Sequence, residues 1–151
     1  MRERGPFDLV VSRWTAEHVR DGKRFHENLR IMLVPGGTAL HLFPTLYALP
    51  FVVNRVLSED LSSALLFRSY RERRVKFPAH YSWCRGPTRG QIAGLEDCGY
   101  SVDHYYGFFG HGFYARLRPV HLLHRLVSRM LVRHPVPLMT SFAVVTLTLE
   151  T

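Results

Sequence analysis

The first 43 residues alternate between strand-like and helix-like hydrophobic patterns, and this alternation constrains the fold more than any other feature. Residues 7–12, FDLVVS, form a nearly continuous apolar run, as in parallel-sheet strands that are covered on both faces. Residues 22–33 carry apolar side chains at helical spacing and predict an amphipathic helix. A Pro-Gly-Gly turn at 35–37 stops the helix and reverses the chain, and TALHLF (38–43) predicts a second strand. The segment is therefore a strand-helix-strand unit.

The remaining residues extend this unit into one predicted α/β domain over 1–151. Two further helices are predicted over 88–100 and 119–134. Two further strands are predicted over 101–109 and 141–150. The intervening residues 45–87 are irregular and rich in aromatic and arginine side chains. They mix short helical stretches with this aromatic and basic segment.

The chain is strongly basic, with a formal net charge of +8 over 151 residues. From residue 104 to the last residue, five arginines stand against one acid, Glu150. Such a charge favours anionic partners. The sequence contains no uncharged apolar run of the length of a membrane span and no apolar stretch of a signal peptide near its first residue. Cys84 and Cys98 lack the spacing of a metal site or a disulfide framework, so we expect free thiols and a cytoplasmic protein.

The order of the sequence motifs resembles the second half of the class I S-adenosylmethionine-dependent methyltransferases, particularly the methyltransferase type 11 group. Residues 7–19, FDLVVSRWTAEHV, are similar to the fourth strand of that family and the Glu-His turn after it. Residues 33–37 carry the Leu-x-Pro-Gly-Gly turn, and LEDCGYSV (95–102) and FAVVTLTLE (142–150) are similar to the last part of the domain. The resemblance implies a Rossmann-like sheet with the family strand order 4-5-7-6 and an antiparallel last strand.

The resemblance also implies S-adenosylmethionine as cofactor and an unidentified methyl acceptor, either a small molecule or a lipid. Ser12, Arg13 and Trp14 follow the first strand and are expected to face the cofactor, because open α/β sheets bind ligands at the carboxyl ends of their strands. Glu17 and His18 are candidate catalytic residues, His18 as a general base. The alternative is that this pair only fixes the turn through local hydrogen bonds.

By this resemblance, residues 45–87 are a lid-like insertion where the family covers its acceptor pocket, so they supply the candidate substrate contacts. These are Tyr47, Asn54, His80, Tyr81 and Trp83, and ordinary packing of the lid is the alternative. No metal site is predicted. The G-x-G-x-x-A pattern at residues 110–115 is interpreted as a turn, because the acid expected about 20 residues further on is missing.

The family's first three strands and its glycine-rich loop have no counterpart in the sequence. We therefore expect the C-terminal half of a methyltransferase domain that does not bind the cofactor alone. The edge of the first strand is expected to be bare, which favours self-association or pairing with another chain.

The helix at 119–134 carries a basic stripe of His121, Arg125, Arg129 and Arg133. Its apolar side is formed by Leu122, Leu126, Val127 and Met130. A basic amphipathic helix of this kind is typical of contact with an anionic membrane or a nucleic acid, although a solvated outer face is the alternative. Nucleic acid is disfavoured because no RNA-recognition or zinc motif accompanies the helix. A second hypothesis is therefore a non-catalytic binding or scaffold half-domain that presents this basic face to a partner.

Overall fold

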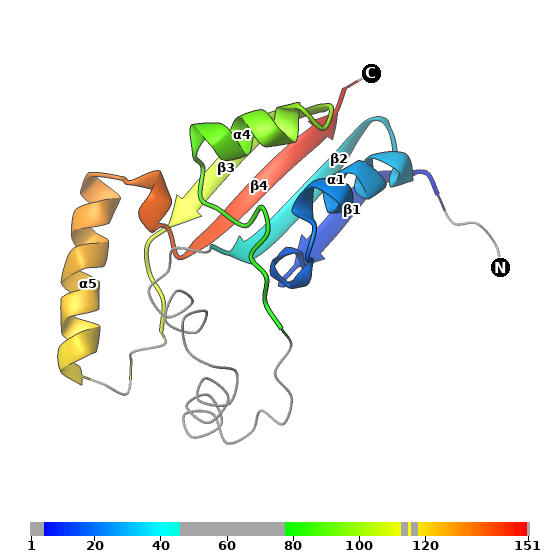
Figure 1. Ribbon diagram of the computed structural model, residues 1–151. Coiled ribbons are helices and arrows are strands. Elements are labelled where there is room, and N and C mark those ends of the chain that lie inside the picture. The colour runs from blue at the N-terminus through cyan, green and yellow to red at the C-terminus, as the bar shows by residue number, and fades with distance from the viewer. Residues whose placement is uncertain (1–4, 46–77, 113–114, 116–117, 151) are drawn as a thin grey trace.

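Four strands form one mixed sheet at the centre of the computed structural model, which describes residues 5–45, 78–112, 115 and 118–150. The strands are β1 (Phe7–Arg13), β2 (Leu33–Pro44), β3 (Tyr100–Phe108) and β4 (Phe142–Leu149), and their spatial order is β1-β2-β4-β3 (Figure 1). β1 pairs with β2 in parallel, whereas β4 is antiparallel to both of its neighbours. This order confirms the predicted 4-5-7-6 arrangement with an antiparallel last strand.

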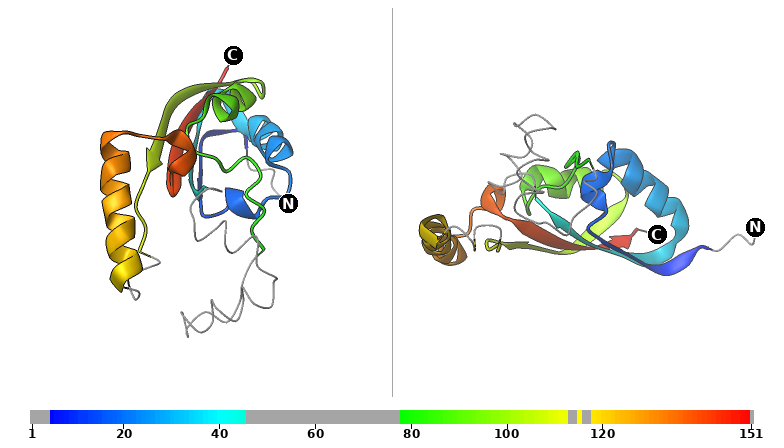
Figure 2. Two further views of the ribbon diagram at one scale, coloured as in Figure 1. Left: turned by 60° about the vertical axis from the view of Figure 1, so that its left-hand side comes forward. Right: turned by 90° about the horizontal axis from the view of Figure 1, so that it is seen from below.

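Helices α1 (Gly22–Met32) and α4 (Arg89–Glu96) cover the same face of the sheet, which we call the covered face (Figure 2). Side chains cap both helices, since Asp21 accepts a hydrogen bond from the Arg24 amide and Thr88 accepts one from the Gln91 amide. A third helix, α5 (Arg118–Arg133), lies to one side of the sheet (Figures 1 and 2). Two 3-10 turns complete the described elements, η1 (Ala16–His18) and η2 (Pro137–Met139).

Alternating residues of the inner strands build the core on the covered face, as the two-residue period of a strand requires. The buried side chains of β2 and β4 include Leu33, Ala39, His41, Phe43, Ala143, Val145, Leu147 and Leu149. Leu95 of α4 and Tyr100 of β3 pack into the same cluster. The core therefore lies between the sheet and its two helices.

The opposite face, which we call the open face, carries no helix within the described residues (Figure 2). Leu9 and Val11 of β1 are 56% and 58% exposed there, and Tyr106 and Phe108 of β3 are 57% and 50% exposed. The continuous apolar run of β1 predicted cover on both faces. Within the described residues only one face is covered, because α1 and α4 pack on the same side.

The Pro-Gly-Gly segment differs from its predicted role as a separate turn between helix and strand. α1 ends at Met32 and β2 begins directly at Leu33, so residues 35–37 belong to the strand. The pairing with β1 moves from Phe7–Leu33 to Leu9–Thr38, which makes the segment a bulge. Gly36 has a φ of +76°, which glycine adopts without strain. The chain is thus bent inside β2 rather than before it.

Candidate functional site

A short 3-10 turn and a distant loop meet just beyond the carboxyl end of β1. The turn is η1, and the loop comprises residues 78–88 and is called the 78–88 loop here. The backbone amides of His80 and Tyr81 both donate to the Glu17 carbonyl, at 2.7 and 3.0 Å. The Gly22 amide donates to the Ser82 hydroxyl at 2.9 Å. These bonds join the loop to the segment that connects β1 with α1.

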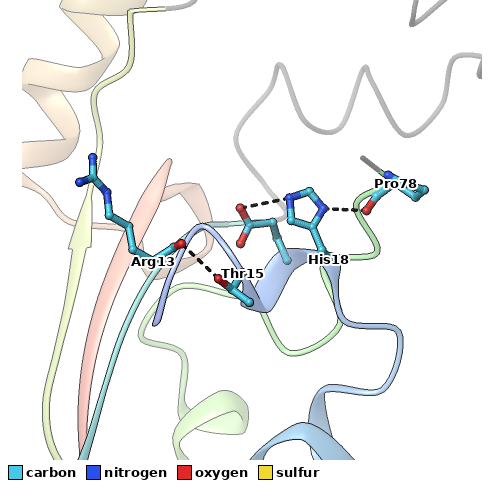
Figure 3. Close-up of polar contacts among 5 residues, drawn as sticks. Arg13, Thr15, His18 and Pro78 are labelled. Atoms are coloured by element: carbon cyan, nitrogen blue, oxygen red, sulfur yellow. Dashed lines mark hydrogen bonds and ion pairs between the residues drawn. The ribbon is translucent and has the colours of Figure 1, made fainter. Parts of the chain in front are cut away.

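The side chain of His18 also joins this segment to the 78–88 loop (Figure 3). Its Nδ1 lies 2.7 Å from the carbonyl oxygen of Pro78. A carbonyl oxygen can only accept, so Nδ1 carries a proton and donates it to Pro78. Nε2 is 3.8 Å from Glu17 Oε1. The histidine thus bridges the buried carboxylate and the start of the 78–88 loop.

The Glu17 side chain is the most unusual polar group of this region. The residue is only 4% exposed, and its Oε2 has no hydrogen-bond partner among the described residues. Burial raises the pKa of the Glu17 carboxyl, although its own backbone amide and His18 act in the opposite direction. Burial also raises the pKa of Tyr81 and of Cys84, and the charge of Glu17 adds to both effects. A carboxyl group in such surroundings can hold or accept a proton near neutrality.

Three residues of this neighbourhood have a left-handed backbone that side chains rarely adopt. Trp14, Tyr81 and Trp83 have φ values of +56°, +51° and +61°, and they are the non-glycine residues of this kind in the described chain. Each such residue costs about 1–3 kcal/mol and persists only where the surroundings impose it, often at functional sites. All three are among the residues predicted from the sequence to line a site.

The 78–88 loop and α4 enclose a pocket of about 560 Å³. Its lining residues are His80, Tyr81, Ser82, Trp83, Arg85, Thr88, Gly90, Gln91 and Gly94. Three of the five predicted substrate contacts, His80, Tyr81 and Trp83, thus lie together. Tyr47 and Asn54 are outside the described residues.

Four polar lining residues were not predicted from the sequence: Ser82, Arg85, Thr88 and Gln91. Arg85 is one of many arginines in a basic chain, and Gln91 lies on a helix whose orientation the sequence does not reveal. The capping Thr88 is the only local signal, because it predicts that α4 begins at the end of the loop.

The three predicted cofactor contacts are not brought together. The Ser12 hydroxyl shares a 2.7 Å hydrogen bond with His41 Nδ1 on the covered face. Arg13 is the next residue of the strand, is exposed, and points away from His18 in Figure 3. Trp14 packs its ring edge-on against Phe142 at a centroid distance of 5.3 Å. None of these three residues lines the pocket beside the 78–88 loop.

The described residues therefore do not by themselves form a site that fits S-adenosylmethionine. The hydroxyl of Ser12 is already engaged, and the unpartnered carboxylate oxygen of Glu17 is buried away from solvent. Cofactor binding remains a prediction.

Two buried histidines next to this region were not predicted as notable. His26 of α1 and His41 of β2 are 5% and 0% exposed, and their ring centroids are 5.3 Å apart. Burial lowers the pKa of His41 to about 4, and burial together with His41 lowers that of His26 to about 3. His26 Nδ1 and His41 Nε2 have no hydrogen-bond partner in the described chain. Both rings are therefore neutral at pH 7.

The described part of the chain contains neither a cluster of metal ligands nor a membrane-spanning helix. No three or more histidine, cysteine, aspartate or glutamate side chains gather there as metal ligands would. Of the helices in residues 5–45, 78–112 and 118–150, none combines the length and apolarity needed to cross a bilayer.

The arrangement of strands and helices is similar to that of several solved protein structures. The chain matches no protein-family model and no curated protein. It is similar in structure to an S-adenosylmethionine-dependent methyltransferase from Mesorhizobium loti, with 17% identity and a TM-score of 0.54. The likeness covers 95% of this chain and 62% of that one. A putative S-adenosylmethionine-dependent methyltransferase from Listeria monocytogenes gives 9% identity, a TM-score of 0.53, and coverage of 99% and 64%.

These likenesses confirm the predicted fold: the chain has, in part, the Rossmann-like fold of a class I methyltransferase. The chain spans less than two thirds of the length of either structure. At these identities the comparison speaks for the fold.

Proposed function

We propose that this chain is the acceptor-binding part of an S-adenosylmethionine-dependent methyltransferase. The observation that carries the proposal is the strained, partly unsatisfied site at the carboxyl end of β1, in a sheet of the methyltransferase type. A fold alone does not imply a function. However, three left-handed residues and a buried carboxylate with a raised pKa lie at the end of the sheet where α/β proteins bind ligands.

The pocket beside the 78–88 loop is the proposed acceptor site. Tyr81 and Trp83 supply aromatic walls, and Gln91 supplies an amide that can both donate and accept. Arg85 and His80 also line it, and no aspartate or glutamate is among the lining residues. Such a lining suits a small polar acceptor that carries an anionic group or several hydrogen-bond acceptors.

Glu17 and His18 receive different roles in this proposal. Glu17 is proposed to hold a proton next to the pocket rather than to contact the acceptor, because its carboxyl has a raised pKa and an unpartnered oxygen but is buried and does not line the pocket. His18 is a positioning residue, because its Nδ1 proton is already used by the Pro78 carbonyl. The Pro78 contact supports the interpretation that the Glu-His pair fixes the turn, and the raised pKa supports a chemical role for Glu17 alone.

The cofactor-binding part is proposed to join the chain along β1. Among the described residues β1 pairs with β2 only, so its other edge offers unpaired amide and carbonyl groups. The two similar structures are longer than this chain by more than a third of their own length. We infer that further polypeptide, on this chain or on a partner, pairs there and completes the cofactor site.

Calorimetric titration with S-adenosylhomocysteine tests the proposal. The 151-residue chain, shown to be folded by circular dichroism, is expected to bind weakly or not at all. The same chain, purified from its native cells together with any further polypeptide that is joined or bound to it, is expected to bind at one site per chain. Binding by neither preparation would overturn the methyltransferase proposal and leave the scaffold hypothesis.

The scaffold hypothesis has its own supporting observation. The arginines of α5 are exposed, and no aspartate or glutamate occurs between Asp103 and Glu150. A half-domain that merely presents this basic helix to an anionic partner would need no cofactor. It would fail to bind S-adenosylhomocysteine in either preparation.

A further inference from the structure

Helix α5 is attached to the molecule along one side only. Leu131 is buried, and Val127 and His124 are half-buried, so these residues face the rest of the chain. The backbone amide of His111, beyond β3, donates to His124 Nε2 at 3.3 Å, and the two imidazole rings stack at 3.9 Å. The helix is therefore held at the flank of the sheet, where Figures 1 and 2 show it standing apart from α1 and α4.

The outward side of α5 carries an apolar stripe of Leu123, Leu126 and Met130. These residues are 64%, 54% and 57% exposed, and their spacing of three and four places them on one side of the helix. Val136, Leu138 and Met139, which follow the helix in the sequence, are exposed as well. Exposed apolar side chains gathered on one side of a helix are typical of an interaction site.

A row of arginines runs parallel to the apolar stripe. Arg125, Arg129 and Arg133 are exposed and recur every four residues, which we call the arginine row. Because successive residues turn by about 100°, the row and the stripe occupy adjoining sides of the helix. The helix contains no acid that could neutralise the row.

The arginine row also lines a hollow of about 760 Å³ between α5 and the end of β3. Phe108, Phe109 and His111 form its other side. Cations, imidazoles and aromatic rings thus border the same space. This lining suits a phosphate group that carries an apolar portion.

We propose that α5 lies on the surface of an anionic phospholipid bilayer, with the apolar stripe in the acyl boundary and the arginine row at the phosphates. The two parallel rows match the two parallel levels of a bilayer surface, apolar and anionic. Arginine stems reach along apolar surface while the guanidinium stays at the polar level. A nucleic acid would use the arginine row but would leave the apolar stripe exposed. The net charge of +8 strengthens attraction to an anionic membrane.

This inference does not depend on methyl transfer, because it rests on α5 and not on the pocket beside the 78–88 loop. Vesicle binding and S-adenosylhomocysteine binding can therefore succeed or fail separately. Vesicle binding together with no S-adenosylhomocysteine binding in either of the two preparations would support this inference while contradicting the proposed function.

Co-sedimentation with vesicles tests the inference on the full chain. We expect binding to vesicles of phosphatidylcholine mixed with phosphatidylglycerol, and little binding to phosphatidylcholine alone. The variant Arg125→Gln/Arg129→Gln/Arg133→Gln should bind about 100-fold more weakly, as expected for three arginines at an anionic surface. No binding of the unaltered chain would overturn the inference.

A matched control separates the arginine row from net charge. Arg20, Arg24 and Arg89 are also exposed and lie outside α5. The variant Arg20→Gln/Arg24→Gln/Arg89→Gln removes the same charge and should keep most of the vesicle affinity. Equal losses in the two triple variants would mean unspecific attraction and would overturn the inference.

A second variant separates a bilayer from a soluble phosphate compound. Leu126→Ser/Met130→Ser leaves the arginine row intact and should weaken vesicle binding by about tenfold or more, because it removes apolar surface that inserts. Glycerol phosphate in excess should not release the unaltered chain from vesicles. Unchanged binding of the serine variant, or full release by glycerol phosphate, would show an anion site without membrane insertion.

Self-association through the same stripe is the remaining competitor. Light scattering on the unaltered chain and on Leu126→Ser/Met130→Ser distinguishes the two. The inference expects the same molecular mass for both proteins. A dimer that the serine variant dissociates, together with absent vesicle binding, would assign the stripe to a second copy of the chain.

Discussion

At the scale of single residues, the buried pair His26 and His41 makes folding sensitive to acid. Both imidazoles are neutral in the folded protein, with pKa values lowered from 6.5 to about 3 and about 4. The unfolded chain binds protons at pH values where the folded chain does not, so protonation favours unfolding. Stability contributed by the pair is fully present above about pH 6.5 and is lost as the pH falls below it.

We predict that the free energy of unfolding declines between pH 6.5 and pH 4, by up to about 1.4 kcal/mol per pH unit for each histidine. Urea denaturation at a series of pH values measures this free energy of unfolding. The variant His26→Leu should reduce the slope, because one titrating group is removed while the site stays apolar. The raised pKa of Glu17 acts in the opposite sense and lessens the total. A slope unchanged in His26→Leu would rule out His26 as a source of acid sensitivity.

At the scale of elements, the start of α1 and the 78–88 loop are in such close contact that glycine is required at residue 22. A Cβ atom built at Gly22 would lie 2.5 Å from Trp83 Cβ and 2.7 Å from the Ser82 carbonyl oxygen. Both neighbours are fixed, since the Ser82 hydroxyl accepts from the Gly22 amide and Trp83 has a left-handed backbone. The helix start thus imposes the strained conformation of the loop.

Gly22→Ala is expected to destabilise the protein by about 1–3 kcal/mol, the usual cost of an added atom in a filled space. Gly90→Ala is the matched control: no atom lies within 4 Å of its added Cβ, and alanine favours the helix, so its effect should be neutral or slightly stabilising. Thermal unfolding of both variants measures the difference. Equal melting temperatures would contradict the close contact.

The elements also show why prediction from sequence succeeded in some places and failed in others. β1, α1 and α4 follow from local hydrophobic patterns, and the strand order follows from the family resemblance. The bulge at residues 35–37 was missed because it depends on the pairing of Leu33 with Phe7, which is not local. His26 was missed because helical spacing does not reveal which polar residue faces the core. His80, Tyr81 and Trp83, which the family resemblance suggested, lie together in one pocket, and their role as substrate contacts stays a prediction.

At the scale of the whole molecule, the two faces of the sheet differ in how far their apolar side chains are covered. α1 and α4 protect the covered face, whereas the open face presents apolar side chains of β1 and β3 within the described residues. The bare edge of β1 adjoins the same face. An unprotected edge beside an apolar face favours association. Association here and membrane contact at α5 use different surfaces, so both can occur in one protein.

We therefore predict that the isolated chain associates through β1 and the open face, and that Val11→Lys reduces this association. Val11 is 58% exposed on the open face, so a charge there opposes a partner without disturbing the core. Ile31→Lys is the control, because Ile31 is an aliphatic residue that is 81% exposed and belongs to α1, which packs on the covered face. Light scattering should give a lower mass for Val11→Lys alone. Hydrogen exchange should give residues 7–13 protection that rises with protein concentration, since a partner would shield the outer amides of β1, which pair with no strand among the described residues. A monomer whose β1 amides are protected as well as those of β4 would contradict the prediction, because the edge would then need no partner.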